Sequence, residues 1–159
     1  MRWGLRAATF NARAETVETK PFFRDAFKRT RCLIPASGYY EWKNTPDSKQ
    51  PYYFSRADGE PMTFAGLWDE WKDSATGEKL KSCTMIITEP NEIAVDIHDR
   101  MPVILDSANF DAWLRDGGTT LLKAPNYVLQ RWPVSKRVNS SKADTNDPTL
   151  IEKVELAAA

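Results

Sequence analysis

The sequence is poor in the side chains that usually bind metal ions or carry protons near neutral pH. Its 159 residues include one histidine, His98, and two cysteines, Cys32 and Cys83. The cysteines lie far apart, each in an apolar stretch, and with a single histidine they do not match the spacings of zinc sites. We therefore expect two buried thiols, no metal site and no cofactor. An unperturbed side chain that titrates near neutrality can only be His98.

Long apolar runs and a net charge are also missing. No stretch approaches the run of about 18 apolar residues that is typical of a transmembrane helix, and the first residues, MRWGLR, lack the apolar run of a secretory signal. We expect a cytoplasmic protein without a membrane partner. The 22 basic residues balance 22 acidic ones, which argues against indiscriminate binding of polyanions.

The basic residues are nevertheless gathered in two groups, one near the start of the chain and one near its end. Their members are Lys20, Arg24, Lys28, Arg29 and Arg31 in the first group, and Arg131, Lys136, Arg137 and Lys142 in the second. Each group is either a solvated surface or a local track for a phosphate backbone. Six Trp, five Tyr and seven Phe supply rings for a core and, beside the cations, for base stacking.

The pattern of apolar and turn residues predicts one α+β domain, made mainly of antiparallel strands with a few short helices. Pro35 either stops its strand or confines it to a sheet edge, and the polar stretch 44–50 forms a hairpin turn. We assign residues 1–156 to this domain and interpret the alanines 157–159 as a remnant that is not native. Helices are expected at 19–29, with Thr19 as cap, and at 107–114, with Ser107 as cap, and strands at 31–35, 36–43, 51–55, 62–68, 80–88, 101–105 and 127–134.

The most crowded polar stretch is 94–102, AVDIHDRMP, which contains His98. Asp96 and Asp99 flank the imidazole, and carboxylates at that distance can fix its tautomer and raise its affinity for a proton. Arg100 follows and could hold an anion. The alternative is a turn histidine held by its neighbours, because structural ion pairs produce the same pattern.

Residues 7–17, AATFNARAETV, look extended rather than helical. In a strand, Asn11, Arg13 and Glu15 would lie on one face, which would combine an amide, a guanidinium and a carboxylate. The alternative is an exposed strand face without a site.

A second alternating stretch is ASGYYEWK at residues 36–43. Tyr39 and Glu41 share one face of the expected strand, and Tyr40 and Trp42 share the other. If the second face is the core, Glu41 opens toward a cleft or solvent.

Several of these stretches together resemble the SOS response-associated peptidase (SRAP) family. The similarity rests on NARAET from Asn11, RCLIP from Arg31, GYYEWK from Gly38, IHDRMP from Ile97 and WPVS from Trp132. It covers nearly the whole chain. The resemblance implies a curved, barrel-like sheet and a role in DNA damage, in which single-stranded DNA with abasic sites becomes covalently linked to the protein. Members have also been described as autopeptidases.

The resemblance also implies roles for single residues. An N-terminal cysteine would trap the aldehyde of the opened abasic sugar, first as an imine and then as a thiazolidine. Asn11 would hold the nucleophile or the sugar, Glu41 would shuttle protons around the imine, and His98 would act as general acid in ring opening. The phosphates beside the lesion would be contacted by Arg13, Thr88 and Arg100.

The chain departs from the family at its first residues. Relatives begin Met-Cys-Gly-Arg, whereas this sequence begins Met1, Arg2, Trp3 and Gly4. We interpret this as an N-terminal truncation that removes the catalytic cysteine, which leaves open whether the chain is active as an enzyme. A missing strand would expose the edge of its neighbour, so a homodimer through that edge is expected.

Two other functions remain open at this stage. The chain could bind single-stranded DNA without forming a bond to it. Alternatively, Cys32 could pair with His98 in a cysteine-type hydrolase, although a thiol in an apolar strand stays protonated and unreactive.

Overall fold

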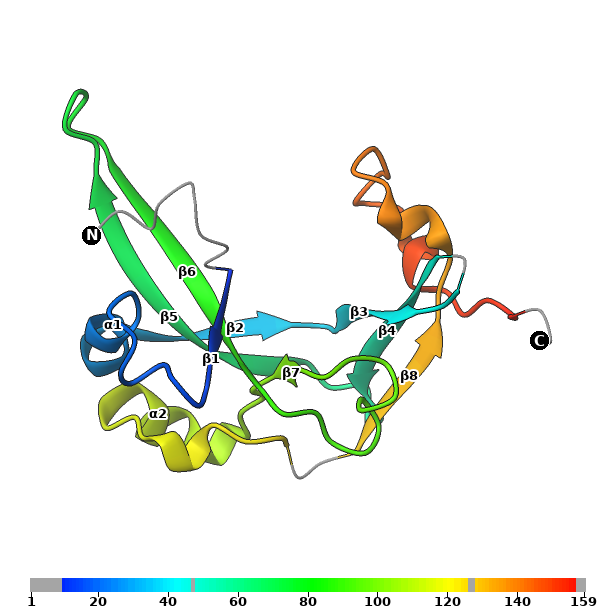
Figure 1. Cartoon of the computed structure of the whole chain (residues 1–159), viewed down its shortest axis with the longest axis horizontal. Coiled ribbons are helices and arrows are strands. Elements are labelled where there is room, and N and C mark those ends of the chain that lie inside the picture. Colours follow the sequence, from blue (N-terminus) through cyan, green and yellow to red (C-terminus); the bar gives the residue numbers. More distant parts are fainter. Residues whose placement is uncertain (1–9, 47, 126–127, 157–159) are drawn as a thin grey trace.

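The computed structural model describes residues 10–46, 48–125 and 128–156, which fold into two β-sheets with a few short helices. The expected α+β class is confirmed. In Figure 1 the β5–β6 hairpin extends on one side and the sheet of β3, β4 and β8 rises on the other. Expectations for residues 1–9 and 157–159 lie outside the described part of the chain.

The first sheet has five strands in the order β1-β6-β5-β2, with β7 paired to β6. Backbone hydrogen bonds from Ala65 to Val103 and from Leu105 to Thr63, both near 2.9 Å, place the segment after β7 beside β5. Because β2 forms the sheet edge, the position expected for Pro35 is confirmed. The strands are β1 (Asn11–Arg13), β2 (Arg31–Ala36), β5 (Met62–Lys72), β6 (Lys79–Thr88) and β7 (Met101–Pro102).

The second sheet is antiparallel and has the order β3-β4-β8. Its strands are β3 (Tyr39–Asn44), β4 (Lys49–Arg56) and β8 (Leu129–Pro133). Asn44 faces Lys49 across the turn, so the hairpin expected at 44–50 is confirmed. β3 lies at an edge of this sheet.

The barrel-like sheet is not found. Both sheets are open in the described part of the chain, with β1 and β2 at the ends of one and β3 and β8 at the ends of the other. The chain passes from β2 to β3 through Gly38, whose missing side chain is essential there. A Cβ at Gly38 would overlap the backbone oxygen of Phe54 and the ring of Tyr53. The close approach of Gly38 to β4 lets β3 pair with β4 in a second sheet instead of extending the first sheet.

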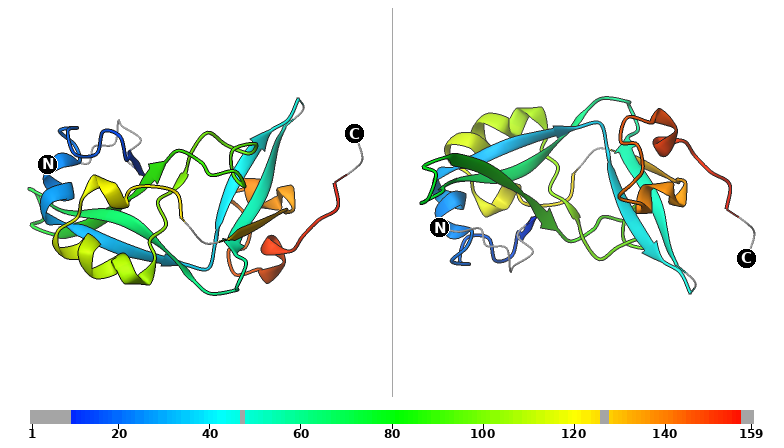
Figure 2. Two further views of the ribbon diagram at one scale, coloured as in Figure 1. Left: turned by 90° about the horizontal axis from the view of Figure 1, so that it is seen from below. Right: turned by 90° about the horizontal axis from the view of Figure 1, so that it is seen from above.

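Short helices cover one face of the first sheet, as Figure 2 shows for α1 and α2. The expected helix at 19–29 is shorter than predicted, because Thr19 forms a turn with Thr16 and the helix begins at Arg24 without a side-chain cap. Ser107 likewise begins a 3₁₀ turn rather than capping α2. The helices are α1 (Arg24–Arg29), α2 (Phe110–Arg115), η1 (Ser107–Asn109), η2 (Thr119–Leu121), η3 (Lys136–Asn139) and η4 (Pro148–Ile151).

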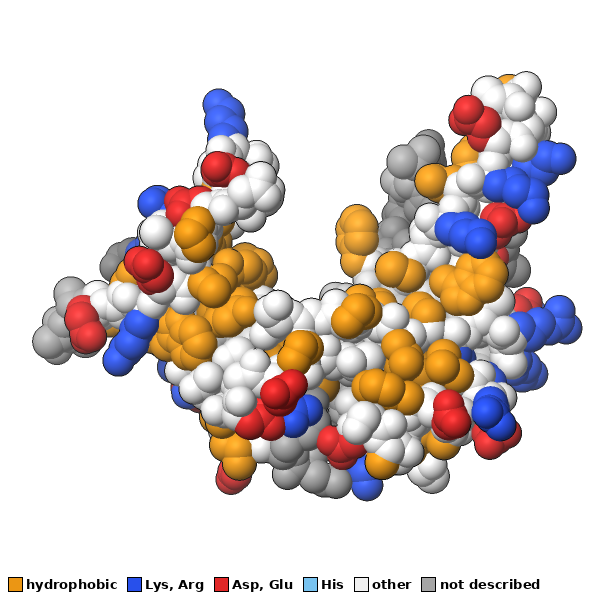
Figure 3. All heavy atoms as spheres, turned by 180° about the vertical axis from the view of Figure 1, so that it is seen from behind, with side chains coloured by type: hydrophobic (Ala, Val, Ile, Leu, Met, Phe, Trp, Pro, Cys, Tyr) orange, Lys and Arg blue, Asp and Glu red, His pale blue; other side chains and the backbone are white. Residues whose placement is uncertain are grey.

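Two hydrophobic cores hold the fold together. The first fills the space between the helices and the first sheet, and the second lies where the two sheets meet. The first core includes Ala12, Val17, Phe23, Phe27, Leu67, Ile86 and Trp113, and the second includes Phe54, Met62, Phe64, Ala94, Ile97, Met101, Ile104 and Leu129. Figure 3 shows further apolar side chains along the hollow between the two sides of the molecule.

The prediction of two buried thiols is wrong. Cys32 is half-buried and Cys83 is exposed. Strand alternation explains the difference: the neighbours Leu33 and Leu67 turn into the first core, so Cys32 and Cys83 face the other side of the sheet. In the described residues, no helix has the length and apolar character required to cross a bilayer.

Trp113 should contribute more to stability than any neighbour on its helix. Its side chain is 0% exposed, its ring packs 6.0 Å from that of Phe27, and its indole N–H donates to the Cys32 carbonyl at 3.0 Å. Trp113→Ala should lower the free energy of unfolding by about 3–5 kcal/mol in urea denaturation. Leu114→Ala, on the same helix but 43% exposed, is the control. Equal losses in the two variants would contradict this account of the core.

Candidate functional site

Glu41 and His98 line one cavity at the edge of the second sheet. The cavity has a volume of about 560 Å³ and follows β3, where it reaches side chains on both faces of that strand. Its walls are formed by Glu41, Trp42, Asn44, Lys49, His98, Val138 and Asn139. A carboxylate, an imidazole, an ammonium group and two amides therefore surround a space suited to a small polar ligand.

Strand alternation places Glu41 at this cavity. Tyr39, two residues earlier on the same face, packs into the second core, with its ring stacked 4.8 Å from that of Phe54. The face of Tyr39 therefore packs into the second core, so the condition under which the sequence analysis opened Glu41 to a cleft, a core face made by Tyr40 and Trp42, does not hold for that core. Glu41, on the same face, nevertheless lines the cavity.

Burial raises the pKa of the Glu41 carboxyl above its ordinary value. Three weaker effects act in the opposite direction: a hydrogen bond from the Trp42 backbone N–H at 3.1 Å, and the nearby charges of His98 and Lys49. The net direction remains upward. Glu41 can thus hold a proton at a higher pH than an exposed glutamate does, which is the property of a general acid.

His98 lies in a turn that Ile97 anchors in the second core. Its Nδ1 atom is 3.1 Å from the Arg100 backbone N–H and 3.1 Å from a carboxylate oxygen of Asp99. The neutral ring can accept from Arg100, which leaves the proton on Nε2, and the protonated ring can donate to Asp99. Each protonation state therefore has a partner, as a proton-transferring histidine requires.

Asp96 ties this turn to the second sheet. Its carboxylate accepts two hydrogen bonds from Arg131 on β8, at 2.7 and 3.0 Å, and one from Lys43 on β3 at 3.2 Å. Lys43 lies two residues from Glu41, and Asp96 two residues from His98. The ion pair at Lys43 therefore sets how the strand of Glu41 meets the turn of His98.

Asn11 and Arg13 lie outside this cavity, on β1. The buried Ala12 between them turns into the first core, so both polar side chains face the opposite side and are exposed. Asn11 is in register with Met85, which packs against the second core. Asn11 therefore lies on the side of the sheet that faces His98 and Glu41, but not among the residues that line their cavity.

The remaining predicted residues, Arg100 and Thr88, are engaged in contacts within the protein. The Arg100 guanidinium forms an ion pair with Glu15, just after β1. Thr88 is buried and donates from its hydroxyl to the Leu122 carbonyl at 3.3 Å. Thr88 and Glu15 line a separate cavity. The predicted site residues therefore fall into two groups, Glu41 and His98 at the first cavity and Thr88 with the Glu15–Arg100 pair at the second. The short segment from His98 to Arg100 joins the two groups.

Sequence reasoning missed Lys49 and Asn139. Lys49 lies in the polar stretch assigned to a hairpin turn, and no local pattern distinguishes it from other turn lysines. Asn139 reaches the cavity because its amide oxygen accepts the indole N–H of Trp42 at 2.7 Å, and its amide nitrogen donates to the Lys49 carbonyl at 3.4 Å. These contacts span about 90 residues in sequence, so no short motif could have indicated them.

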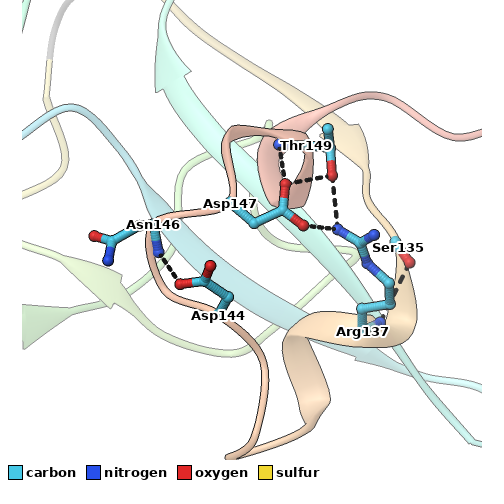
Figure 4. Close-up of polar contacts among 6 residues, drawn as sticks. All are labelled: Ser135, Arg137, Asp144, Asn146, Asp147 and Thr149. Atoms are coloured by element: carbon cyan, nitrogen blue, oxygen red, sulfur yellow. Dashed lines mark hydrogen bonds and ion pairs between the residues drawn. The ribbon is translucent and has the colours of Figure 1, made fainter.

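A polar network, drawn in Figure 4, joins η3, the element that contains Asn139, to the C-terminal segment. Arg137 on η3 pairs with Asp147 at 2.6 Å and donates to the Thr149 hydroxyl at 2.7 Å. Asp147 also accepts from the backbone N–H of Thr149, which caps η4. The network fixes η3, and with it Val138 and Asn139, against the C-terminal segment.

The side chains that could ligate a metal ion do not indicate a metal site in the part of the chain that the structure describes. In the ranges that the structure describes, no three His, Cys, Asp or Glu side chains are grouped closely enough to hold an ion. The geometry brings two titratable groups to one cavity: a carboxyl group with a raised pKa and a histidine whose Nδ1 atom lies near both a donor and a carboxylate.

The chain belongs to the SOS response associated peptidase (SRAP) family, whose model matches residues 1–141. It is 38% identical to the abasic site processing protein YoqW of Bacillus subtilis, over 96% of this chain and 75% of that protein. It is 32% identical to the abasic site processing protein HMCES of Xenopus tropicalis, over 91% of this chain and 54% of that protein.

A solved structure with the same fold comes from Bacteroides thetaiotaomicron. It superimposes with a TM-score of 0.83 at 30% sequence identity, over 92% of this chain and 66% of that one. The chain therefore spans about two thirds to three quarters of the length of YoqW and the Bacteroides protein.

Asp96→Asn should loosen the turn that carries His98. In the folded protein the hydrogen bonds from Arg131 and Lys43 lower the pKa of Asp96 to about 2. The ion pairs therefore contribute above about pH 4, where an unfolded aspartate is ionised, and this contribution is lost as pH falls toward 2. We expect faster amide hydrogen exchange in residues 91–100 at neutral pH, and less than about 1 kcal/mol of lost stability because Asp96 is 48% exposed.

Asp116→Asn provides the matched control for this experiment. Asp116 lies at the end of α2, away from the His98 turn. Unchanged hydrogen exchange in residues 91–100 of Asp96→Asn would show that the carboxylate does not hold the turn.

Proposed function

We propose that the chain binds single-stranded DNA at abasic sites and that the Glu41–His98 cavity receives the opened sugar. The names of its relatives, abasic site processing proteins, support the substrate. The observation that carries the proposal is the pairing of Glu41, whose pKa is raised by burial, with His98 in one polar cavity. An abasic sugar has no base, so the protein can bind it without recognising the edge of a base.

The proposed chemistry begins when the sugar ring opens to an aldehyde. His98 donates a proton to the ring oxygen as the bond from it to C1′ breaks, and the proton of the C1′ hydroxyl passes to a water molecule. A neutral amine then attacks C1′: the C–N bond forms, and the amine proton moves to the former carbonyl oxygen. Glu41 protonates that hydroxyl, which leaves as water, and the nitrogen then returns its proton to the Glu41 carboxylate to give an imine. In relatives with an N-terminal cysteine, the thiol adds to the imine carbon and its proton moves to nitrogen, which closes a thiazolidine.

Neither cysteine of this sequence can complete that last step. A thiazolidine requires a free amine and a thiol on the same residue, whereas the nitrogens of Cys32 and Cys83 are in peptide bonds. Burial raises the pKa of Cys32 to about 11, and Cys32 does not line the cavity of His98. Both observations also weigh against the alternative of a cysteine-type hydrolase.

The phosphate contacts are proposed for Arg13 first. Its side chain is exposed on the side of β1 that also carries Asn11, which we propose as the residue that holds the sugar or the amine. Arg100 would have to exchange Glu15 for a phosphate, and Thr88 would have to release the Leu122 carbonyl. We therefore propose that these two residues contact DNA only after such an exchange.

The adduct itself provides the test. The 159-residue polypeptide, incubated with an abasic single-stranded oligonucleotide, should give no adduct that survives heating in detergent. With borohydride present a weak adduct should appear, because an imine through the Met1 amine needs no thiol. Glu41→Gln should slow trapping by about 100-fold, the lower end of general acid catalysis, whereas the exposed Glu78→Gln at the hairpin tip should not.

Each other outcome identifies a different error. Equal trapping rates in Glu41→Gln and Glu78→Gln would remove Glu41 from the chemistry. A strong adduct without borohydride would show that another nucleophile replaces the missing thiol. Retention of the oligonucleotide in a native gel, with no trapping at all, would show that the chain only binds the DNA.

A homodimer through an exposed strand edge is a further proposal. β1 pairs with β6 on one side and ends the sheet in the part of the chain that the structure describes. Its backbone could therefore pair with a second copy. The backbone N–H of Arg13 faces that free edge, because Ala14 donates to Ile87 on β6 and successive residues of a strand bond on alternate sides. Sedimentation should give a dimer whose dissociation constant rises when Arg13 is replaced by proline, and a monomer at all concentrations would contradict the proposal.

A further inference from the structure

The cavity of Glu41 contains a cation that neither the sequence argument nor the family resemblance assigned. Lys49 begins β4 and lies opposite Asn44, where the hairpin turns and the cavity opens. Its side chain is exposed, and its charge acts on Glu41. Resting on the function proposed above, we infer that Lys49 forms an anion subsite that holds the phosphate attached to the abasic sugar.

The other basic residues around the cavity are already engaged. Lys43 and Arg131 share Asp96, and Arg100 is paired with Glu15. Lys136 donates to the Ser48 hydroxyl at 2.7 Å. Among the residues that the structure describes, Lys49 is the ammonium group that lines the cavity and forms no ion pair within the protein.

The surroundings of Lys49 match a sugar phosphate. An ammonium group binds phosphate as a compact point charge, without a required direction of approach. Asn44 and Asn139 supply amide groups at the same cavity, and Trp42 supplies an apolar wall for the carbon face of a deoxyribose. The volume of about 560 Å³ lies within the range of small-molecule sites.

A phosphate at Lys49 would also change the state of Glu41. In the empty cavity the Lys49 charge lowers the pKa of Glu41, against the larger effect of burial. The single negative charge of a bound phosphodiester offsets the Lys49 charge, so the neutral acid form of Glu41 is favoured. The substrate would thereby favour the acid form of the group that acts on it.

The experiment compares two small ligands, 2-deoxyribose 5-phosphate and 2-deoxyribose, on the full chain. Binding is followed through the indole N–H resonance of Trp42, which lies at the cavity through its bond to Asn139. The wild-type chain should prefer the phosphorylated sugar by about tenfold or more, as loss of a charged hydrogen bond would predict. Lys49→Gln should abolish that preference, Lys49→Arg should keep most of it, and Lys142→Gln, in an exposed loop, should leave it unchanged.

The outcomes separate this inference from the proposed function. An equal preference in the wild type and Lys49→Gln, or no binding of the phosphorylated sugar by the wild type, overturns the subsite whatever happens with DNA. If the preference depends on Lys49 but no abasic oligonucleotide is bound or trapped, the subsite stands and the proposed function fails. If trapping proceeds but is independent of Lys49, the function stands and the phosphate is held elsewhere.

Discussion

The candidate site depends on the carboxylate of Asp96, held between Arg131 on β8 and Lys43 on β3. The turn that carries His98 has little regular structure of its own, and Ile97 fixes only its inner side to the core between the sheets. The ion pairs fix its outer side. Each exposed pair stabilises the fold by less than about 1 kcal/mol, so their main effect is positional. They hold an imidazole and a carboxylic acid, more than 50 residues apart in sequence, at one cavity.

Local patterns in the sequence predicted much of the fold. Short apolar runs bounded by turn residues located β2 and β5, and the polar stretch 44–50 located the β3–β4 turn. These local patterns gave wrong predictions where contacts between distant parts of the chain determine the structure. The close approach of Gly38 to β4 directs β3 into a second sheet, and no local signal separates that arrangement from a continuous, curled one. The thiols were misplaced because an apolar strand can turn a cysteine to either face.

The candidate site was predicted in the same uneven way. Glu41 and His98 stood out because each is a titratable group in a segment of otherwise clear pattern, and the structure brings both to one cavity. Lys49 and Asn139 did not stand out, since their proximity arises from the return of β8 and η3 beside the β3–β4 hairpin. Arg100 could be recognised as a cation but not as the partner of Glu15, because that contact joins two distant parts of the chain.

Three carboxylates around the site have pKa values shifted in different directions, and the difference assigns their roles. Hydrogen bonds from Arg131 lower the pKa of Asp96. At Glu15 the upward effect of burial is outweighed by a backbone hydrogen bond and by Arg100, so its pKa is also lowered. Both groups therefore stay ionised and can only position their partners. At Glu41 burial prevails and the pKa is raised, so of the three carboxyls this one retains its proton to the highest pH. Lys49, across the same cavity, opposes that shift until an anion binds it, which couples occupancy of the site to its acid–base state.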